Sequence, residues 1–272
     1  MIKRLKVYDA QGILDLEGIC PEVVADVTNV VETSGKPGSS LVLSRNVLDV
    51  PTAKKWAPRI RDAQKLIANG VFCDQETLEA AFEGDNFSIE VLDVSCSITK
   101  TQEPIANVIS KSANLKILNL GGLKTSMSTT RSPIVSSILQ LSNLLELDLS
   151  YAPWISPSDW SDLLSSLESL TSLSMVSAQM PDVSFEVTWL PNLERLNVTN
   201  CSLDWTTFSE WLTVSDVIQV NASRTEISLD AVQMVVDAKQ ESSRRLKLIL
   251  RFWQEPNKLQ LQNATGHVQI VL

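Results

Sequence analysis

The sequence predicts an α/β solenoid in which short parallel strands line one side of a coil and helices line the other. Three observations predict this fold class. An apolar pattern recurs along the chain at nearly constant intervals, as it does in repeat proteins. Residues around the pattern alternate between apolar and polar, which is the period of a half-buried strand. Helical periodicity with N-cap signals follows several copies of the pattern.

The repeated pattern consists of apolar residues at positions 1, 4 and 6 of each unit. Its copies are Ile89-x-x-Leu92-x-Val94, Leu115-x-x-Leu118-x-Leu120, Leu144-x-x-Leu147-x-Leu149, Leu170-x-x-Leu173-x-Met175, Leu193-x-x-Leu196-x-Val198 and the weaker Val217-x-x-Val220-x-Ala222. The intervals between them are 26, 29, 26, 23 and 24 residues. Position 11 is apolar again in four copies, at Trp154, Met180, Leu203 and Ile227. Because one strand and one helix cannot bury their apolar faces alone, the units must stack on one another.

A helix is predicted in the second half of the unit. The clearest signal is Ser156-Pro157-Ser158-Asp159, with an N-cap serine, a proline in the first turn and an acid at the third helical position. An apolar face follows at helical spacing, made of Trp160, Leu163, Leu164 and Leu167. Similar segments begin at Ser132, Asp204 and Ser228. Each unit is therefore expected to contain a strand, a turn and a helix of roughly ten residues.

Residues Leu193 to Leu203 match the pattern L-x-x-L-x-L-x-x-[N/C]-x-L best, with Val198 at the third leucine position and Cys201 at position 9. On this pattern the chain resembles the leucine-rich-repeat superfamily, and its unit length is similar to the ribonuclease-inhibitor-like and cysteine-containing classes. The resemblance implies a horseshoe with strands on the concave side and helices on the convex side. Other residues replace the Asn or Cys at position 9 in the remaining copies, so the usual polar ladder is expected to be incomplete. These residues are Ser97, Leu123, Ala152, Ala178 and Thr225.

We expect residues 1–272 to form a single solenoid, with degenerate repeats and insertions at 1–87, regular repeats at 88–250 and an irregular end at 251–272. Further copies are predicted at Ser243-x-x-Leu246-x-Leu248 and His267-x-x-Ile270-x-Leu272. A chain ending on such a strand lacks a polar cap, which suggests a fragment, an oligomer contact or an unusual ending. Weaker copies begin at Ile2, Gly38 and Ala63, and Ser34 to Ser40 is the best candidate for a loop.

Composition excludes several classes of function. The net charge of −9 disfavours sequence-independent binding to nucleic acid. A single histidine, His267, and four widely spaced cysteines make two-imidazole sites, Cys–His catalysis and zinc binding improbable. We therefore expect no catalytic, cofactor-binding or metal-binding residues. The chain has neither a secretory leader nor an apolar stretch of membrane-spanning length, so we expect an intracellular, reducing location, cytoplasmic or nuclear, with no membrane partner.

The predicted binding site is the face of the strands that points away from the core. Positions 3 and 5 of the repeats face solvent there, because side chains alternate along a strand. The candidate partner-binding residues are Asp93, Asn119, Glu146, Asp148, Ser172, Ser174, Arg195, Asn197, Gln219, Asn221, Arg245 and Lys247. Acids dominate the early repeats and bases the late ones, which would steer a partner of opposite charge order. The alternative interpretation is that any exposed sheet carries polar residues, and this face lacks the aromatic cluster typical of a high-affinity contact.

The seven tryptophans divide into two groups. Helical or repeat spacing predicts that Trp154, Trp160, Trp205 and Trp211 belong to the core. Trp56, Trp189 and Trp253 are less constrained, and an exposed one would mark a contact surface.

The resemblance implies a non-catalytic scaffold or adaptor that binds a protein partner and can be one subunit of a larger complex. Three alternatives stay open. One is the substrate receptor of a ubiquitin ligase, because the segment Cys20-Pro21-Glu22-Val23-Val24 weakly resembles the start of an F-box segment. Another is the recognition part of an immune receptor. The third is an activator of Ran-type GTPases, for which Arg45-Asn46 is the plausible contact.

Overall fold

The structure is a computed structural model that describes residues 13–15, 40–44, 47–128, 131–240, 245–253 and 267–272. The chain divides into two compact units, residues 1–144 (unit 1) and 145–272 (unit 2). In both units the described strands pair in parallel and alternate with helices or turns along the chain. This confirms the predicted α/β fold class, a solenoid of stacked leucine-rich-repeat-type units.

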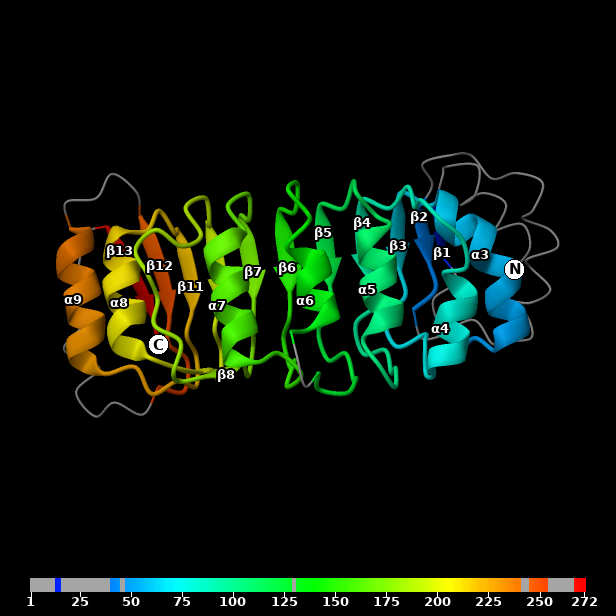
Figure 1. Cartoon of the computed structure of the whole chain (residues 1–272). Helices are drawn as coiled ribbons and strands as arrows, with labels where there is room; N and C mark the ends of the chain where they lie inside the picture. The colour runs from blue at the N-terminus through cyan, green and yellow to red at the C-terminus, as the bar shows by residue number, and fades with distance from the viewer. Residues whose placement is uncertain (1–12, 16–39, 45–46, 129–130, 241–244, 254–266) are drawn as a thin grey trace. The chain divides into compact units, whose positions relative to one another are not determined.

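The described part of unit 1 contains five parallel strands in the order β1-β2-β3-β4-β5, and the four helices described there lie on one face of them (Figure 1). The strands are β1 Ile13–Asp15, β2 Ser40–Val42, β3 Lys65–Ile67, β4 Val91–Asp93 and β5 Ile117–Asn119. The helices are α3 Val50–Asp62, α4 Gln75–Ala81, α5 Glu103–Ser110 and α6 Pro133–Ile138. The loosely matching copies at Gly38 and Ala63 are thus confirmed as strands, and β1 is a strand that the sequence did not predict.

Among its described residues, unit 2 contains six parallel strands in the order β6-β7-β9-β11-β12-β13, with three helices on one face (Figure 1). The strands are β6 Glu146–Asp148, β7 Ser172–Ser174, β9 Arg195–Asn197, β11 Gln219–Asn221, β12 Leu246–Ile249 and β13 Val268–Val271. The helices are α7 Pro157–Ser166, α8 Trp205–Val214 and α9 Leu229–Lys239. Two short strands, β8 Gln179–Met180 and β10 Ser202–Leu203, form a separate parallel pair.

The central residue of each strand, at repeat position 4, stacks on its counterpart in the next strand. In unit 1 the register aligns Leu41, Leu66, Leu92 and Leu118, all at most 2% exposed. In unit 2 the register aligns Leu147, Leu173, Leu196, Val220 and Leu248, all at most 3% exposed. The position-1 residues Leu115, Leu144, Leu170 and Leu193 are buried as well. These aliphatic side chains therefore form a dry seam within each unit, as the predicted stacking of repeats requires.

The predicted helix starts are confirmed. Ser132, Asp204 and Ser228 each accept a hydrogen bond from a backbone N–H in the first turn of α6, α8 and α9. At α7, Ser156 and Asp159 form the full capping box, in which each side chain bonds the backbone of the other. These caps satisfy N–H groups that have no partner within the helix. They explain why the helices begin where the sequence indicated.

One unit departs from the predicted strand–turn–helix order. Between β7 and β9, no helix occurs among the described residues, and residues 181–192 run in turns. This is the shortest of the six predicted units, and Pro181 and Pro191 bound the segment. Phe185 fills the space that helix side chains take in other units, because its ring contacts those of Phe208 and Trp211 at centroid distances of 5.1 and 5.6 Å. The expectation of a helix in every unit was wrong here.

The tryptophans follow the prediction only in part. Trp154, Trp160 and Trp211 are buried core residues as expected, whereas Trp205 is half-buried. The three less constrained tryptophans, Trp56, Trp189 and Trp253, are also buried, so none of them marks a contact surface.

The seventh predicted repeat is displaced by two residues. Val220 pairs with Leu248 and not with Leu246, so the unit reads Arg245-x-x-Leu248-x-Leu250. Ile270 in turn pairs with Leu248, which confirms the last copy at His267. The error arose because β12 has four residues with Leu246 and Leu248 both buried, and either pair of leucines fits the apolar pattern.

The turn after each of the strands β3, β4, β5, β6, β7, β9, β11 and β12 contains one left-handed residue at position 8. Their φ angles lie between 56° and 68°; the residues are Gly70, Cys96, Gly122, Tyr151, Ser177, Asn200, Arg224 and Phe252. Glycine adopts this conformation without steric cost, whereas other residues pay for it. The recurrence of this conformation independently supports the register that places Arg245 at position 1.

The first prediction separates backbone strain from packing at this turn. An added Cβ would meet nothing within 4 Å at Gly70 but would lie 3.3 Å from Cys96 Sγ at Gly122. We expect Gly70→Ala to lower the free energy of unfolding by about 1 kcal/mol through strain alone. Gly122→Ala should lower it further because Cys96 must also move. Urea unfolding of both variants measures this, and a Gly70→Ala protein as stable as the parent would contradict the left-handed turn.

Candidate functional site

The candidate site is the face of each sheet that the helices leave open. Strand residues alternate between a buried centre and half-exposed flanks, so positions 3 and 5 lie on the face opposite the helices (Figure 1). Asp93 and Asn119 lie on this open face in unit 1. The other ten predicted binding residues belong to unit 2, in four strands and in or just before β12. Parallel sheets usually have both faces covered, so an open one is available for contacts.

Five of the predicted binding residues serve the turns. At position 5, an Asp or Asn side chain accepts a hydrogen bond from the backbone N–H of position 7 at 2.8–3.2 Å; these residues are Asp93, Asn119, Asp148, Asn197 and Asn221. The bond satisfies an N–H group at the point where the strand ends. The sequence carried this signal, since five of six regular repeats have Asp or Asn at position 5.

Where position 5 holds another residue, a serine from the preceding repeat replaces it. Ser174 occupies position 5 after β7, and the N–H of Val176 instead donates to Ser150 Oγ at 3.2 Å. Ile249 occupies it in β12, and the N–H of Arg251 donates to Ser223 Oγ at 3.1 Å. The polar residues at positions 5 and 7 therefore form a hydrogen-bonded edge, and much of their capacity is already used within the chain.

The ladder at position 9 is incomplete, as predicted. Cys201 Sγ lies 2.8 Å from the carbonyl oxygen of Met175, and burial raises the pKa of its thiol to about 12. Thr225 donates to the carbonyl of Ala222 at 2.7 Å. Ser97 is fully buried, and its hydroxyl has no partner among the described residues. Position 9 therefore satisfies the turn only in some repeats, and position 5 carries most of that role.

Glu146 and Arg195 form an ion pair across the open face of unit 2. Both occupy position 3, in register with Ser172 on the strand between them. Arg195 Nη2 donates to Glu146 Oε1 at 3.2 Å, and both side chains are over 40% exposed. Part of the charge pattern predicted for partner binding, acids in early repeats and bases in late ones, is thus neutralised by contacts within the protein. An exposed pair of this kind contributes at most about 1 kcal/mol to stability.

The cations at the far end of unit 2 have no such partner. Lys247 lies opposite Gln219 and Gln269, and Arg245 precedes the same strand. Both are exposed, and neither forms an ion pair within the described part of the chain. Arg251, at position 7, and Arg224, at position 8, lie next to them and were missed by the sequence analysis. The corrected register of β12 also moves Arg245 from position 3 to position 1 and Lys247 from position 5 to position 3.

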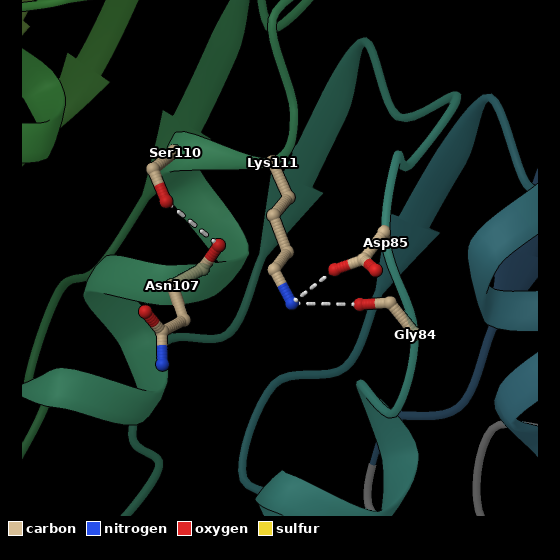
Figure 2. A network of polar contacts seen from close by, with 5 residues as sticks. All are labelled: Gly84, Asp85, Asn107, Ser110 and Lys111. Carbon is tan, nitrogen blue, oxygen red and sulfur yellow. Dashed lines mark hydrogen bonds and ion pairs between the residues drawn. The ribbon is translucent and has the colours of Figure 1, made fainter.

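Unit 1 contains a second charged cluster away from the open face. Figure 2 shows Lys111, the residue after α5, between the backbone of Gly84 and the carboxylate of Asp85. Its Nζ donates to Gly84 O at 2.8 Å and lies 2.9 Å from Asp85 Oδ1. The hydrogen bond from Lys111, with its positive charge, lowers the pKa of Asp85. The cluster joins neighbouring repeats and leaves no free cation for a ligand.

Two surface cavities lie along the turns of unit 2. The larger, of about 640 Å³, is lined by Asn200, Arg224, Thr225, Glu226, Ile227, Ser228, Phe252 and Trp253. The smaller, of about 450 Å³, is lined by Tyr151, Ala152, Pro153, Ile155, Trp160, Ser177 and Gln179. Tyr151 and Phe252 are 60% and 71% exposed, so each cavity has one accessible aromatic ring on its wall.

Within the described ranges, no group of three His, Cys, Asp or Glu side chains is placed to hold a metal ion. The helices that the structure describes are too short or too polar to cross a membrane. Several sequence-based expectations lie outside the described residues: the repeat copy at Ile2, the F-box-like segment from Cys20, the loop residues 34–39 and the Arg45-Asn46 pair.

Among solved structures, the chain is similar to a leucine-rich-repeat protein of Leptospira interrogans. The two share 17% sequence identity over 86% of this chain and 72% of that one, with a TM-score of 0.37. No family model and no curated protein matches the sequence. The class of this protein therefore rests on its own geometry: parallel strands in register, a left-handed turn at position 8 and helices on one face define a leucine-rich-repeat-type solenoid.

The second prediction concerns cysteine reactivity. Cys73 and Cys96 are exposed, whereas Cys201 is buried with a pKa of about 12. The thiolate is the species that reacts with iodoacetamide. At pH 8 we therefore expect Cys201 to react about 100-fold more slowly than the exposed thiols, or slower still. Mass spectrometry of a Cys20→Ser protein over time resolves the three sites. As the control, the three thiols should react at equal rates in about 6 M guanidinium chloride, where the protein is unfolded. Rapid labelling of Cys201 in the native protein would contradict its burial.

The third prediction is a pH dependence at Asp85. Since its pKa is lowered in the folded state, its pairing with Lys111 stabilises the fold above the unfolded pKa and is lost as pH falls through the folded pKa. In Lys111→Met, we expect the pKa of Asp85 to rise toward its ordinary value. The difference in stability between the two proteins should shrink on acidification. Carboxyl NMR titration and urea unfolding measure both effects, with Lys100→Met as control; an unchanged Asp85 titration would refute the pairing.

Proposed function

We propose that this protein is a non-catalytic protein-interaction scaffold that binds a partner across the open face of unit 2. The observation that supports this most directly is the parallel sheet of unit 2, whose described helices all lie on one face (Figure 1). Such a face presents rows of side chains at fixed spacing, about 4.8 Å from strand to strand, on a rigid support. We include the ribonuclease-inhibitor-like subclass in the proposal, because helices of 6 to 13 residues connect most strands.

The charges on the open face support a protein partner. The position-3 row of unit 2 runs Glu146, Ser172, Arg195, Gln219 and Lys247 in adjacent strands. Charged and amide side chains at fixed spacing recognise a complementary surface, and they influence association rate and specificity more than affinity. The proposal extends to an adaptor role in a larger complex. The ubiquitin-ligase and GTPase-activating alternatives depend on residues outside the described part, and no observation favours them or the immune-receptor alternative.

The fourth prediction uses the internal ion pair to separate binding from folding. Glu146→Arg and Arg195→Glu each break the pair, while the double variant restores it with opposite orientation. If a partner contacts this face, we expect both single variants and the double variant to lose it in affinity capture from source cells. The free energy of unfolding of the double variant should return to within about 0.5 kcal/mol of the parent.

The Glu90–Lys116 pair of unit 1, with a 2.7 Å Nζ–Oε2 distance, provides the matched control. The same swap there should leave the captured partner unchanged. Retention of the partner by the Glu146/Arg195 double variant would show that the contact does not use this row.

A further inference from the structure

We propose that a basic strip on unit 2 binds an acidic, extended segment of a partner protein. The basic strip consists of Arg224, Arg245, Lys247 and Arg251, and the exposed ring of Phe252 lies beside it. This inference rests on the proposed function and specifies the chemistry of the partner.

The cations of the basic strip lie in one line along β12 and its turn. Arg245, Lys247 and Arg251 alternate with buried residues, so they share the open face of the sheet. At about 3.3 Å per residue, Arg245 and Lys247 lie about 7 Å apart along the strand, and Arg251 follows in the turn after β12. The backbone N–H of Arg224 donates to the carbonyl of Arg251 at 3.0 Å, which places Arg224 next to that turn.

The four cations are a local excess of positive charge, although the whole chain carries a net charge of −9 and Glu226 lines the same cavity as Arg224. None of them takes part in an ion pair within the described residues. Their strand neighbours are uncharged: Gln219 and Asn221 on one side and Gln269 on the other. The acids of β6, Glu146 and Asp148, lie four strands away in the sheet order. That is about 19 Å, beyond the screening length of about 8 Å at physiological ionic strength.

Phe252 provides an apolar contact beside these charges. Its ring is 71% exposed, and the guanidinium carbon of Arg224 lies 4.9 Å from the ring centroid. Phe252 also has φ of 60°, at the position that Gly70 and Gly122 occupy in other turns. A bulky residue there pays for the left-handed conformation, and this one gains little burial in return. Contact with a ligand would supply the missing burial.

The adjacent cavity of about 640 Å³ can receive an apolar side chain of the bound segment. Most polar groups of its wall are already used: Trp253 Nε1 donates to Ile227 O, Thr225 donates to Ala222 O, and Ser228 caps α9. The rings of Phe252 and Trp253 and the side chain of Ile227 remain as its apolar lining. Glu226 supplies a carboxylate to the same wall as Arg224. The apolar lining favours a peptide, which can insert an apolar side chain, over the phosphate backbone of a nucleic acid.

The test measures binding of a fluorescein-labelled 12-residue peptide of Glu and Asp with one central Leu to the full chain. Fluorescence anisotropy gives the dissociation constant at low salt. We expect Lys247→Glu/Arg251→Glu to weaken binding about tenfold or more, since two attractive contacts with peptide carboxylates become repulsive. The matched control is Lys100→Glu/Lys124→Glu, two exposed lysines of unit 1 that give the same net charge. We expect the control to bind as the parent does.

Phe252→Gly distinguishes a binding role from a structural one. Glycine suits the left-handed turn, so the variant should unfold at the same or a higher urea concentration than the parent. We nevertheless expect it to bind the peptide about fivefold more weakly, because the apolar contact is lost. A variant that keeps full affinity would remove Phe252 from the proposal.

Two outcomes would overturn the basic strip as an acidic-peptide site. One is equal affinity of the strip variant and the control. The other is a 20-base-pair DNA duplex that binds as tightly as the peptide and is lost with the same variant, which would indicate a general polyanion site. If the Glu146/Arg195 variants lose the cellular partner while the strip variant keeps it, the proposed function stands and the basic strip fails.

Discussion

The structure depends on one constraint: a single aliphatic side chain at the centre of each strand must stack on the same side chain of the next strand. Leu66, Leu92 and Leu118 do so in unit 1, and Leu173, Leu196 and Val220 do so in unit 2. Because strand side chains alternate, this stacking also fixes every flanking residue on the open face. A shift of one residue would exchange the two faces. The core therefore specifies the surface, row by row.

The turns also provide hydrogen-bond partners for backbone N–H groups at the ends of the short strands. A left-handed residue at position 8 reverses the chain, and an Asp or Asn at position 5 accepts the exposed N–H of position 7. Serines from the preceding repeat take over where position 5 lacks an acceptor. This arrangement compensates for the incomplete Asn/Cys ladder. The Asp or Asn at position 5 of the open face is therefore needed to form the turn, whether or not it also contacts a ligand.

The sequence predicted what depends on local patterns. The seam leucines, the caps at Ser156 and Asp204 and the strands at Gly38 and Ala63 all follow from spacing and residue chemistry. Prediction failed where two patterns compete or where packing decides. Leu246 and Leu248 both fit position 4, and only pairing with Val220 selects Leu248. Phe185 replaces a helix through contacts with residues more than 20 positions away. The Glu146–Arg195 pair needs the three-strand register, which local patterns do not contain.

That ion pair has a consequence for how the open face can select among ligands. A molecule that contacts Glu146 or Arg195 must first replace the bond between them, so the protein carries its own competitor for the site. An exposed pair is worth at most about 1 kcal/mol, equivalent to about a fivefold penalty in affinity. A ligand that offers a cation to Glu146 and an anion to Arg195 recovers the penalty, whereas a ligand with a single matching charge does not. If the open face binds a partner as proposed, the ion pair therefore favours ligands that contact both Glu146 and Arg195 over ligands that contact one of them.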